Sequence, residues 1–249
     1  MRWSRRGVAA TLLAFAVAAV CVRLGVWQLD RLQQRRALNA AVRAQLARPA
    51  LPLDAARARE LAREPERFLY RRVRLRGVFD AERRLVLRSR AHDGRPGVHL
   101  VARLRLDDSP YAALVNRGWV PAADGATPDA AWPPEPGRVE VEAIVQPLPP
   151  DAGESRPVRL QAPGGPLSSY LVLDRGVRDN LAAATHGPLL PARFDRLSAS
   201  PSASPPLPVP APTLGEGNHL SYAVQWFSFA AIALGGWLLM LLRARRATR

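Results

Sequence analysis

The sequence has a single cysteine, Cys21, and no lysine. One cysteine excludes an intrachain disulfide and a metal cluster built on cysteines. Also absent are the HExxH zinc motif, a glycine-rich phosphate loop ending in lysine, a nucleophile elbow and a CxxC pair. These absences argue against the common metalloprotease, nucleotide-binding, hydrolase and thiol-redox classes.

One set of residues can be assembled into a hydrolase triad: Ser168 or Ser169 with His186 and Asp174. No strand-turn-helix context marks these positions, and such a set arises by chance in a chain rich in serine and aspartate. We therefore expect no catalytic residues.

Arginine alone supplies the formal net charge of +15, because lysine is absent. So basic a chain raises nucleic acid as a partner, since phosphate binding needs clustered cations. Much of the excess charge, however, lies on two short tails without acidic residues, 1–6 and 243–249. This distribution is typical of membrane anchors, and we expect no nucleic-acid partner.

Residues 7–29 form the first of two apolar segments, interrupted only by Arg23. At about 1.5 Å rise per residue, this length is sufficient for a bilayer core roughly 30 Å thick. Trp27 fits the interfacial aromatic belt. The alternative is a cleaved signal peptide, in which Cys21 suggests a lipid-modified cysteine. Bulky Val20 before that cysteine and the helix-forming sequence that follows favour an uncleaved anchor.

Residues 220–242 form the second apolar segment and contain no charged residue. They meet the length criterion for a transmembrane helix, and an arginine-rich tail follows. The pair Gly235-Gly236 allows close approach of another helix. One face of the segment is polar enough to seek a partner helix, and it carries Ser221, Gln225 and Ser228.

The region between the anchors predicts a β-rich domain over residues 30–197. A helical stalk extends to Pro49, and Asp54 caps a short helix that ends at Pro65. A further helix is expected over 174–185. Apolar and polar residues alternate along 73–79, 98–106 and 139–145, and shorter strands are expected at 85–87, 112–115 and 170–173.

We expect an α+β membrane protein, in which two transmembrane helices flank an antiparallel, β-rich extracytoplasmic domain that forms a small barrel or sandwich. The proline-rich residues 198–217 should act as a stiff linker that cannot pack a core. Short basic tails place both termini in the cytoplasm, so the two-pass chain lies in the inner (cytoplasmic) membrane with its central domain in the periplasm.

The four histidines occupy different predicted settings. His92, His99 and His186 are expected in ordinary solvated places, and the spacing of the first two makes a joint metal site improbable. His219 begins the second anchor, one turn before Tyr222 and two before Trp226. Imidazole is a good axial ligand for haem iron, and aromatic side chains on the same face can flank a porphyrin. The alternative, a polar interfacial residue that caps the helix, is favoured by the sequence pattern alone.

Short motifs are spread over nearly the whole chain. They read G-V-W-Q-L at 25–29 with Arg31, V-R-L-R-G-V-F-D at 73–80, G-V-H at 97–99, V-N-R-G-W-V-P at 115–121 and N-H-L-S-Y-A-V-Q-W-F at 218–227. In this order and with two anchors, they resemble the Surfeit locus protein family of cytochrome c oxidase assembly factors.

The resemblance implies a non-enzymatic role in building haem-copper oxidase, at or near insertion of haem a into the large subunit. It implies oxidase subunits and haem-synthesis proteins as partners beside the lipid bilayer, and His219 as the residue that binds haem. Two other functions stay open: a scaffold that docks oxidase subunits without a cofactor, and a generic periplasmic sensor or transport accessory.

The motif at 115–121 also has a physical interpretation. Gly118 permits a bend or a close backbone approach, Trp119 supplies a large buried anchor, and Pro121 ends strand pairing. Arg117 is the residue that we expect to be functional, on a haem propionate or on a partner carboxylate, because a guanidinium fork suits both.

Overall fold

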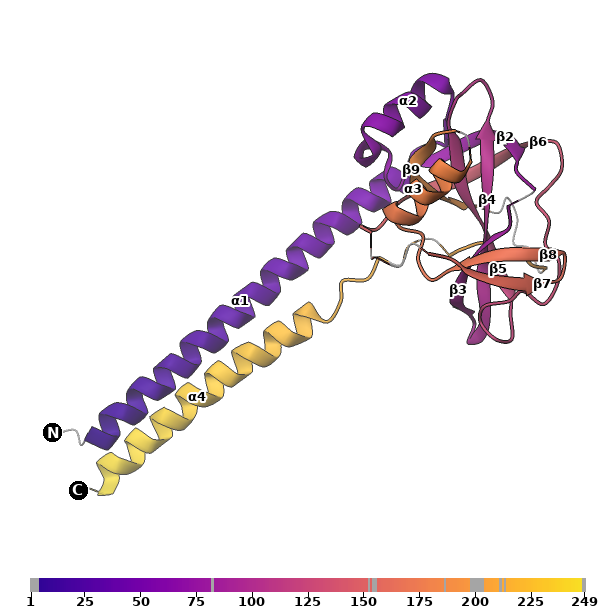
Figure 1. Ribbon diagram of the computed structural model, residues 1–249. Coiled ribbons are helices and arrows are strands. Elements are labelled where there is room, and N and C mark those ends of the chain that lie inside the picture. Colours follow the sequence, from indigo (N-terminus) through magenta and orange to yellow (C-terminus); the bar gives the residue numbers. More distant parts are fainter. Residues whose placement is uncertain are drawn as a thin grey trace. The chain divides into compact units, whose positions relative to one another are not determined.

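The computed structural model describes residues 5–81, 83–151, 153, 156–185, 187–197, 204–210, 212 and 214–247. Its contacts divide the chain into a helix unit, Met1–Val42 with Thr213–Arg249, and a β unit, Arg43–Pro212. Figure 1 shows the elements: α1 (Arg5–Ala47), β1 (Leu51–Pro52), α2 (Ala55–Arg63), a 3-10 helix (Pro65–Phe68), β2 (Arg72–Phe79), β3 (Leu85–His92), β4 (Arg95–Leu106), β5 (Ala112–Pro121), β6 (Arg138–Pro147), β7 (Val158–Ala162), β8 (Gly165–Tyr170), α3 (Arg175–Ala184), β9 (Leu189–Arg196) and α4 (His219–Ala247).

The β unit is built around a closed barrel. Strands β2, β6, β9, β5 and β4 are neighbours in this order, and β4 pairs back with β2 along Gly77–Phe79. Gly77 permits this closure, because a Cβ at this position would collide with the carbonyl oxygen of Arg105. The predicted barrel-like domain is confirmed. The expectation of a wholly antiparallel sheet is wrong, since β1 pairs in parallel with β2, β3 with β8, and β5 with β9.

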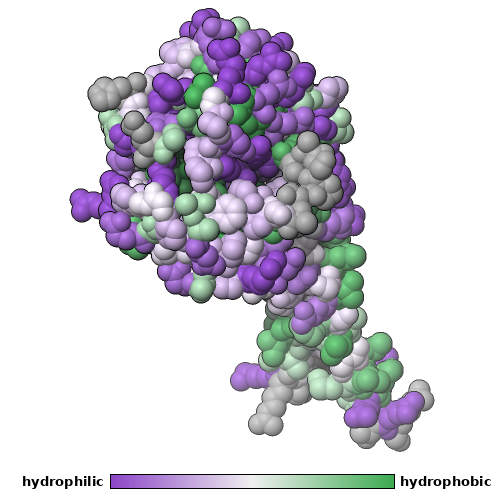
Figure 2. Space-filling view, turned by 90° about the vertical axis from the view of Figure 1, so that its right-hand side faces the viewer, coloured by the Kyte–Doolittle hydropathy of each residue, from purple (hydrophilic) through white to green (hydrophobic). Residues whose placement is uncertain are grey.

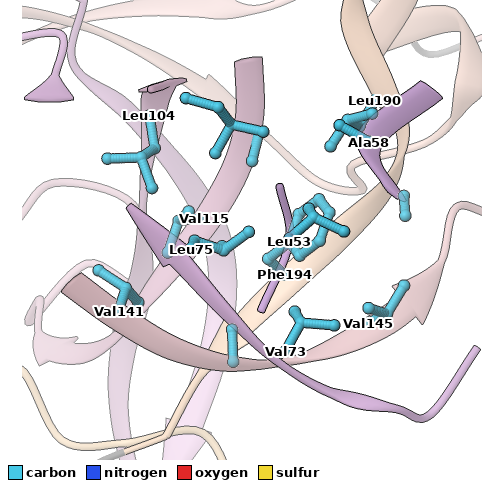
Figure 3. Close-up of a cluster of buried hydrophobic side chains, with 14 of the residues drawn as sticks. Leu53, Ala58, Val73, Leu75, Leu104, Val115, Val141, Val145, Leu190 and Phe194 are labelled. Carbon is cyan, nitrogen blue, oxygen red and sulfur yellow. The ribbon is translucent and has the colours of Figure 1, made fainter. Parts of the chain in front are cut away.

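The barrel is filled by the apolar members of the alternating strands. Figure 3 shows Leu75 of β2, Val115 of β5 and Phe194 of β9 in one cluster. Ala58 and Leu61 of α2 join this cluster and are fully buried, so the short helix packs on the barrel. Full burial of one Leu or Phe side chain contributes roughly 1.5–3 kcal/mol, so this cluster is the main source of stability in the β unit.

A second apolar cluster joins α3 to the sheet. Val177 and Leu181 of α3 pack with Leu85 of β3 and Leu114 of β5. The helix begins after Asp174, whose carboxylate accepts a hydrogen bond from the Val177 N–H at 2.8 Å. The helix predicted over 174–185 is thereby confirmed.

The structure differs from the strand predictions in several places, and strands β1 and β7 were not predicted. The strand expected over 170–173 is wrong, because β8 ends at Tyr170, where its pairing with Leu87 of β3 ends. Strand β9 was not predicted, because Pro191 interrupts its pattern and proline is rare inside a sheet. The structure accommodates this proline at an irregularity in the pairing of β9 with β5.

Part of the region expected to be a linker packs within the β unit. Leu207 and Trp119 exchange two backbone hydrogen bonds, of 2.7 and 2.8 Å, as an isolated antiparallel bridge. The expectation that residues 198–217 cannot pack is therefore wrong at Leu207. Residues 198–203, 211 and 213 of that stretch lie outside the described part of the chain.

In the helix unit, α1 and α4 run antiparallel. The indole N–H of Trp237 donates to the Thr11 hydroxyl at 3.0 Å near one end, and Gln28 contacts His219 near the other. Both helices are long and apolar enough to cross a membrane. Figure 2 shows hydrophobic side chains along this unit and a largely hydrophilic surface on the β unit.

Small side chains line the contact between the two helices. Ala18 and Cys21 of α1 are buried together with Ala230 of α4. Residues spaced three or four positions apart lie on one face of a helix, so these small side chains of α1 face α4. Gly25 continues the series, since a Cβ there would lie 2.7 Å from the Phe227 ring.

The predicted contact face of α4 differs from this one. The polar residues Ser221, Gln225 and Ser228 are exposed, and the two glycines Gly235 and Gly236 have open space where a Cβ would project. Dispersion contacts between small side chains favour the close approach of two helices. The hydroxyls of Ser221 and Ser228 donate to the carbonyl oxygens of Asn218 and Val224, so they add little to that approach. The expectation that α4 uses its polar face to contact its partner helix is therefore wrong for α1.

Candidate functional site

The strongest candidate site is the end of the helix pair at which α4 begins. We call it the helix mouth and define it by Gln28, Arg36 and Asn39 of α1 with Glu216 and His219. His219 is the first residue of α4, and its side chain is partly buried. Its Nδ1 lies 2.8 Å from Oε1 of Gln28, which is itself nearly buried.

The Gln28 contact determines which ring nitrogen of His219 is available. A carboxamide oxygen accepts hydrogen bonds, so the Nδ1 of His219 carries the proton in this pair. The lone pair of Nε2 is then free to bind a metal, and a partner on the opposite nitrogen fixes the ring orientation. Metal-ligating histidines usually donate a hydrogen bond from their other ring nitrogen in this way.

The chain before α4 is held against α1 by two further contacts. Arg36 forms a bidentate ion pair with Glu216, with both N···O distances at 2.9 Å. The amide of Asn39 donates to the carbonyl oxygens of Leu214 and Gly215, each at 3.2 Å. A buried asparagine bonded to backbone fixes a segment more firmly than the exposed ion pair does, because solvent screens the latter.

The two aromatic residues expected beside His219 are placed differently. The side chain of Tyr222 is exposed one turn along α4, where it is free to contact a ligand. Trp226 is partly buried against the cluster of Ala18, Cys21 and Ala230 between the helices. Its ring lies edge-on to that of Phe229, with 5.8 Å between the ring centroids. Of the two, Tyr222 therefore has the more accessible ring.

Arg117, the fourth predicted ligand residue, belongs to the β unit and is nearly buried. Its guanidinium donates to the carbonyl oxygens of Trp132 and Pro133 at 3.0 and 2.8 Å, and lies 3.4 Å from the carboxylate of Glu135. Burial lowers the pKa of Arg117, and the charge of Glu135 opposes that effect. Arg117 thus fastens the loop after β5 to the barrel and is not part of the helix mouth.

The surrounding motif forms a β-bulge. Leu100 of β4 pairs with Gly118 and Val101 pairs with Asn116, so Arg117 is the extra residue of β5. Gly118 adopts a φ of +127°, which favours glycine, and any Cβ there would collide with the carbonyl oxygen of Leu207. The predicted bend and close backbone approach at Gly118 are both present.

His99 lies in a polar network that its sequence did not reveal. Its Nδ1 is 3.2 Å from the amide nitrogen of Asn116, which also donates to Asp195 at 3.0 Å. Burial, together with the positive charge of Arg90, lowers the pKa of His99 to about 4. The expectation of an ordinary solvated histidine is wrong here, because the network includes Asp195 of β9, a strand distant in the sequence.

The other predicted positions form no catalytic site in the described residues. Asp174 is used as the cap of α3, and the hydroxyl of Ser168 accepts a hydrogen bond from Arg159 at 2.8 Å. His186 lies outside the described residues. The described ranges contain no cluster of three or more His, Cys, Asp or Glu side chains that could hold a metal ion.

Known proteins match this chain over most of its length. Residues 15–231 match the model of the SURF1 family. A SURF1-like protein of Monosiga brevicollis is 28% identical over 95% of this chain and 89% of its own length. A SURF1-like protein of Drosophila melanogaster is 29% identical over 89% of this chain and 74% of its own length. The cytochrome oxidase assembly protein SHY1 of Saccharomyces cerevisiae is 29% identical over 47% of this chain and 29% of its own length.

Proposed function

Because the chain belongs to the SURF1 family, we propose that it is an assembly factor for cytochrome c oxidase and that it works without catalysing a reaction. The name of the yeast relative supports the assembly role. The relatives that match most of the chain support extending that role to the whole molecule, since the match covers both helices and the β unit. Its partners are then subunits of haem-copper oxidase and proteins of haem synthesis.

The proposal places α1 and α4 across the inner (cytoplasmic) membrane. Their length, their apolar surface and their small-residue contact support this placement. The antiparallel arrangement brings the basic ends at Arg5 and Arg245 to the same end of the pair, and the positive-inside rule assigns that end to the cytoplasm. The helix mouth then opens at the periplasmic face, and the β unit is periplasmic.

Within this role, the helix mouth holds haem a as cargo on its way to the large subunit of the oxidase. One observation carries this part: Gln28 binds the Nδ1 of His219, which leaves Nε2 free as a ligand atom. The exposed ring of Tyr222 supplies an adjacent aromatic contact. A histidine whose other ring nitrogen is held by a hydrogen bond presents its ligand atom in one orientation.

A deletion strain tests the assembly role. Membranes that lack the protein should contain much less assembled oxidase, measured from the haem a absorption band and by blue-native electrophoresis, and the full chain should restore it. A His92→Ala chain serves as the matched histidine control. It should also restore the oxidase, because His92 is a residue of the β unit, where it lies against Trp119, and is not one of the residues of the helix mouth. Unchanged oxidase in the deletion strain would contradict the proposal.

The His219→Ala chain separates two forms of this role. If the mouth carries haem, the variant should fail to restore full oxidase levels. If it restores them completely and still co-purifies with oxidase subunits, the protein is a scaffold that needs no cofactor.

A further inference from the structure

The β unit contains a cavity of about 520 Å³ that no part of the proposed function uses. It lies where the start of β3, strands β7 and β8, and the end of α3 come together. Its apolar lining includes the buried residues Leu85, Leu167 and Leu181, and the buried Tyr170 contributes a phenol. A volume of this size is typical of sites for small organic ligands.

Four arginines line this cavity: Arg83, Arg84, Arg156 and Arg159. Three of them are held in place by neutral acceptors. Arg83 donates to the carbonyl oxygen of Ala184 at 2.7 Å, Arg84 to those of Gly165 and Pro163 at 2.6 and 2.8 Å, and Arg159 to the Ser168 hydroxyl at 2.8 Å. Carbonyl and hydroxyl acceptors orient a guanidinium without neutralising its charge.

The positive charge here is not compensated within the described residues. No described Asp or Glu lines the cavity, and none of the four arginines forms an ion pair with a described carboxylate. Several other arginines of the β unit do pair with carboxylates: Arg72 with Glu142, Arg76 with Glu140, and Arg193 with Asp195. Arg156 also borders a neighbouring hollow that does carry acidic residues, Asp151 and Asp179. Among the described lining residues, the lack of Asp and Glu distinguishes this cavity from its neighbour.

We propose that this cavity binds an organic anion with at least two carboxylate or phosphate groups and an apolar portion that packs on Leu85, Leu167 and Leu181. Arginine forks bind both kinds of oxyanion in bidentate fashion, so several guanidinium groups around one cavity select a multiply charged ligand. Tyr170 serves as a neutral hydrogen-bond donor, because burial raises the pKa of its phenol and keeps it protonated. All of the lining residues belong to the β unit, whereas His219 belongs to the helix unit.

Isothermal titration calorimetry on the full chain in a non-ionic detergent tests this site. Citrate and inorganic pyrophosphate are the two probes, each measured against sodium chloride at the same ionic strength. Arg156→Gln is the principal variant, because no described contact of Arg156 is lost with it, and Arg159→Gln is the second. Arg105→Gln is the matched control: it removes one charge from an exposed arginine of β4 that forms no ion pair with a described residue.

Saturable binding of at least one probe is expected, with a dissociation constant at least tenfold larger in Arg156→Gln and unchanged in Arg105→Gln. Tighter binding of citrate identifies carboxylate as the ligand group, and tighter binding of pyrophosphate identifies phosphate. The proposal is overturned if neither probe binds saturably, or if the control weakens binding as much as Arg156→Gln does. Neither result bears on oxidase assembly, because no readout involves haem or oxidase.

Discussion

Gly118 offers a sharp test of the β unit, because two independent features make it intolerant of a side chain. Its φ of +127° is a conformation that L-residues rarely adopt, which costs about 1–3 kcal/mol. Its Cβ would also collide with the backbone carbonyl of Leu207, and relief of an overpacked contact typically costs about 1–3 kcal/mol more. Gly118→Ala should therefore destabilise the β unit by roughly 2–6 kcal/mol.

The matched control is Gly125→Ala. Gly125 also has positive φ, at +68°, but nothing lies within 4 Å of its Cβ position. A non-glycine residue in the left-handed region costs about 1–2 kcal/mol, so this variant carries the conformational cost alone. Thermal unfolding in detergent, followed by near-UV circular dichroism, measures both. For a domain of this size each kcal/mol lowers Tm by about 2–4 °C, so the Gly118 variant should melt on the order of 10 °C lower.

The comparison of the two variants decides the reasoning. If Gly118→Ala lowers the free energy of unfolding no more than Gly125→Ala does, then the segment at Leu207 does not lie against the bulge of β5. A second measurement addresses the same contact: the amide proton of Leu207, bonded to the Trp119 carbonyl, should exchange slowly in the native chain and quickly in Gly118→Ala.

Three further predictions concern other parts of the chain. Gly25→Leu should separate α1 from α4 near Phe227 at a cost of about 1–3 kcal/mol, seen as a lower melting temperature of the helical signal in far-UV circular dichroism. The pKa of His99 is lowered to about 4 in the folded chain, so between about pH 6.5 and 4 the unfolded chain binds the proton more readily. The free energy of unfolding should therefore fall as the pH falls through that window, by up to about 3 kcal/mol, and urea titrations measure it. Asp174→Ala should cost about 1–2 kcal/mol, because the Val177 N–H loses its cap, and urea unfolding at pH 7 measures it.

Each of these has its own control. Gly236→Leu should leave the helical melting temperature unchanged, since its Cβ position is open, and equal losses in both glycine variants would refute the packing argument. In His99→Gln, the free energy of unfolding should fall less between about pH 6.5 and 4. An equal fall in this variant would assign the pH dependence to other titratable groups. Asp54→Ala removes the cap of α2, which is exposed, and a larger loss there than at the buried Asp174 would contradict the account.

The sequence predicts the elements whose signals are local. Alternation of apolar and polar residues around Val73 and Val141 marks the barrel strands, because each strand buries one face. The uncharged run after His219 marks α4, because a helix with an apolar surface all round carries no charged residue over that length. The family motifs also name both partners of the helix mouth, Gln28 and His219. Their contact follows once the two helices pair.

Features that depend on distant partners leave no such trace. Strand β9 carries Pro191, which excludes it from any local strand pattern, and only its bulged pairing with β5 explains the exception. The polar network of His99 depends on Asn116 of the next strand and, through it, on Asp195 of β9, which is far away in the chain. The sequence points to the serines and glutamine of α4 as its contact face, because polarity is visible in a sequence while the fit of Ala230 against Ala18 and Cys21 is not.

The absorption spectrum of the purified full chain tests the central claim most directly. Protein from cells that make haem a should carry a haem spectrum, and His219→Ala should abolish it. Gln28→Ala should weaken haem retention by roughly 10- to 100-fold, because the ring of His219 loses the partner that orients it. A haem spectrum that is unchanged in His219→Ala would contradict the assignment of the helix mouth as the haem site.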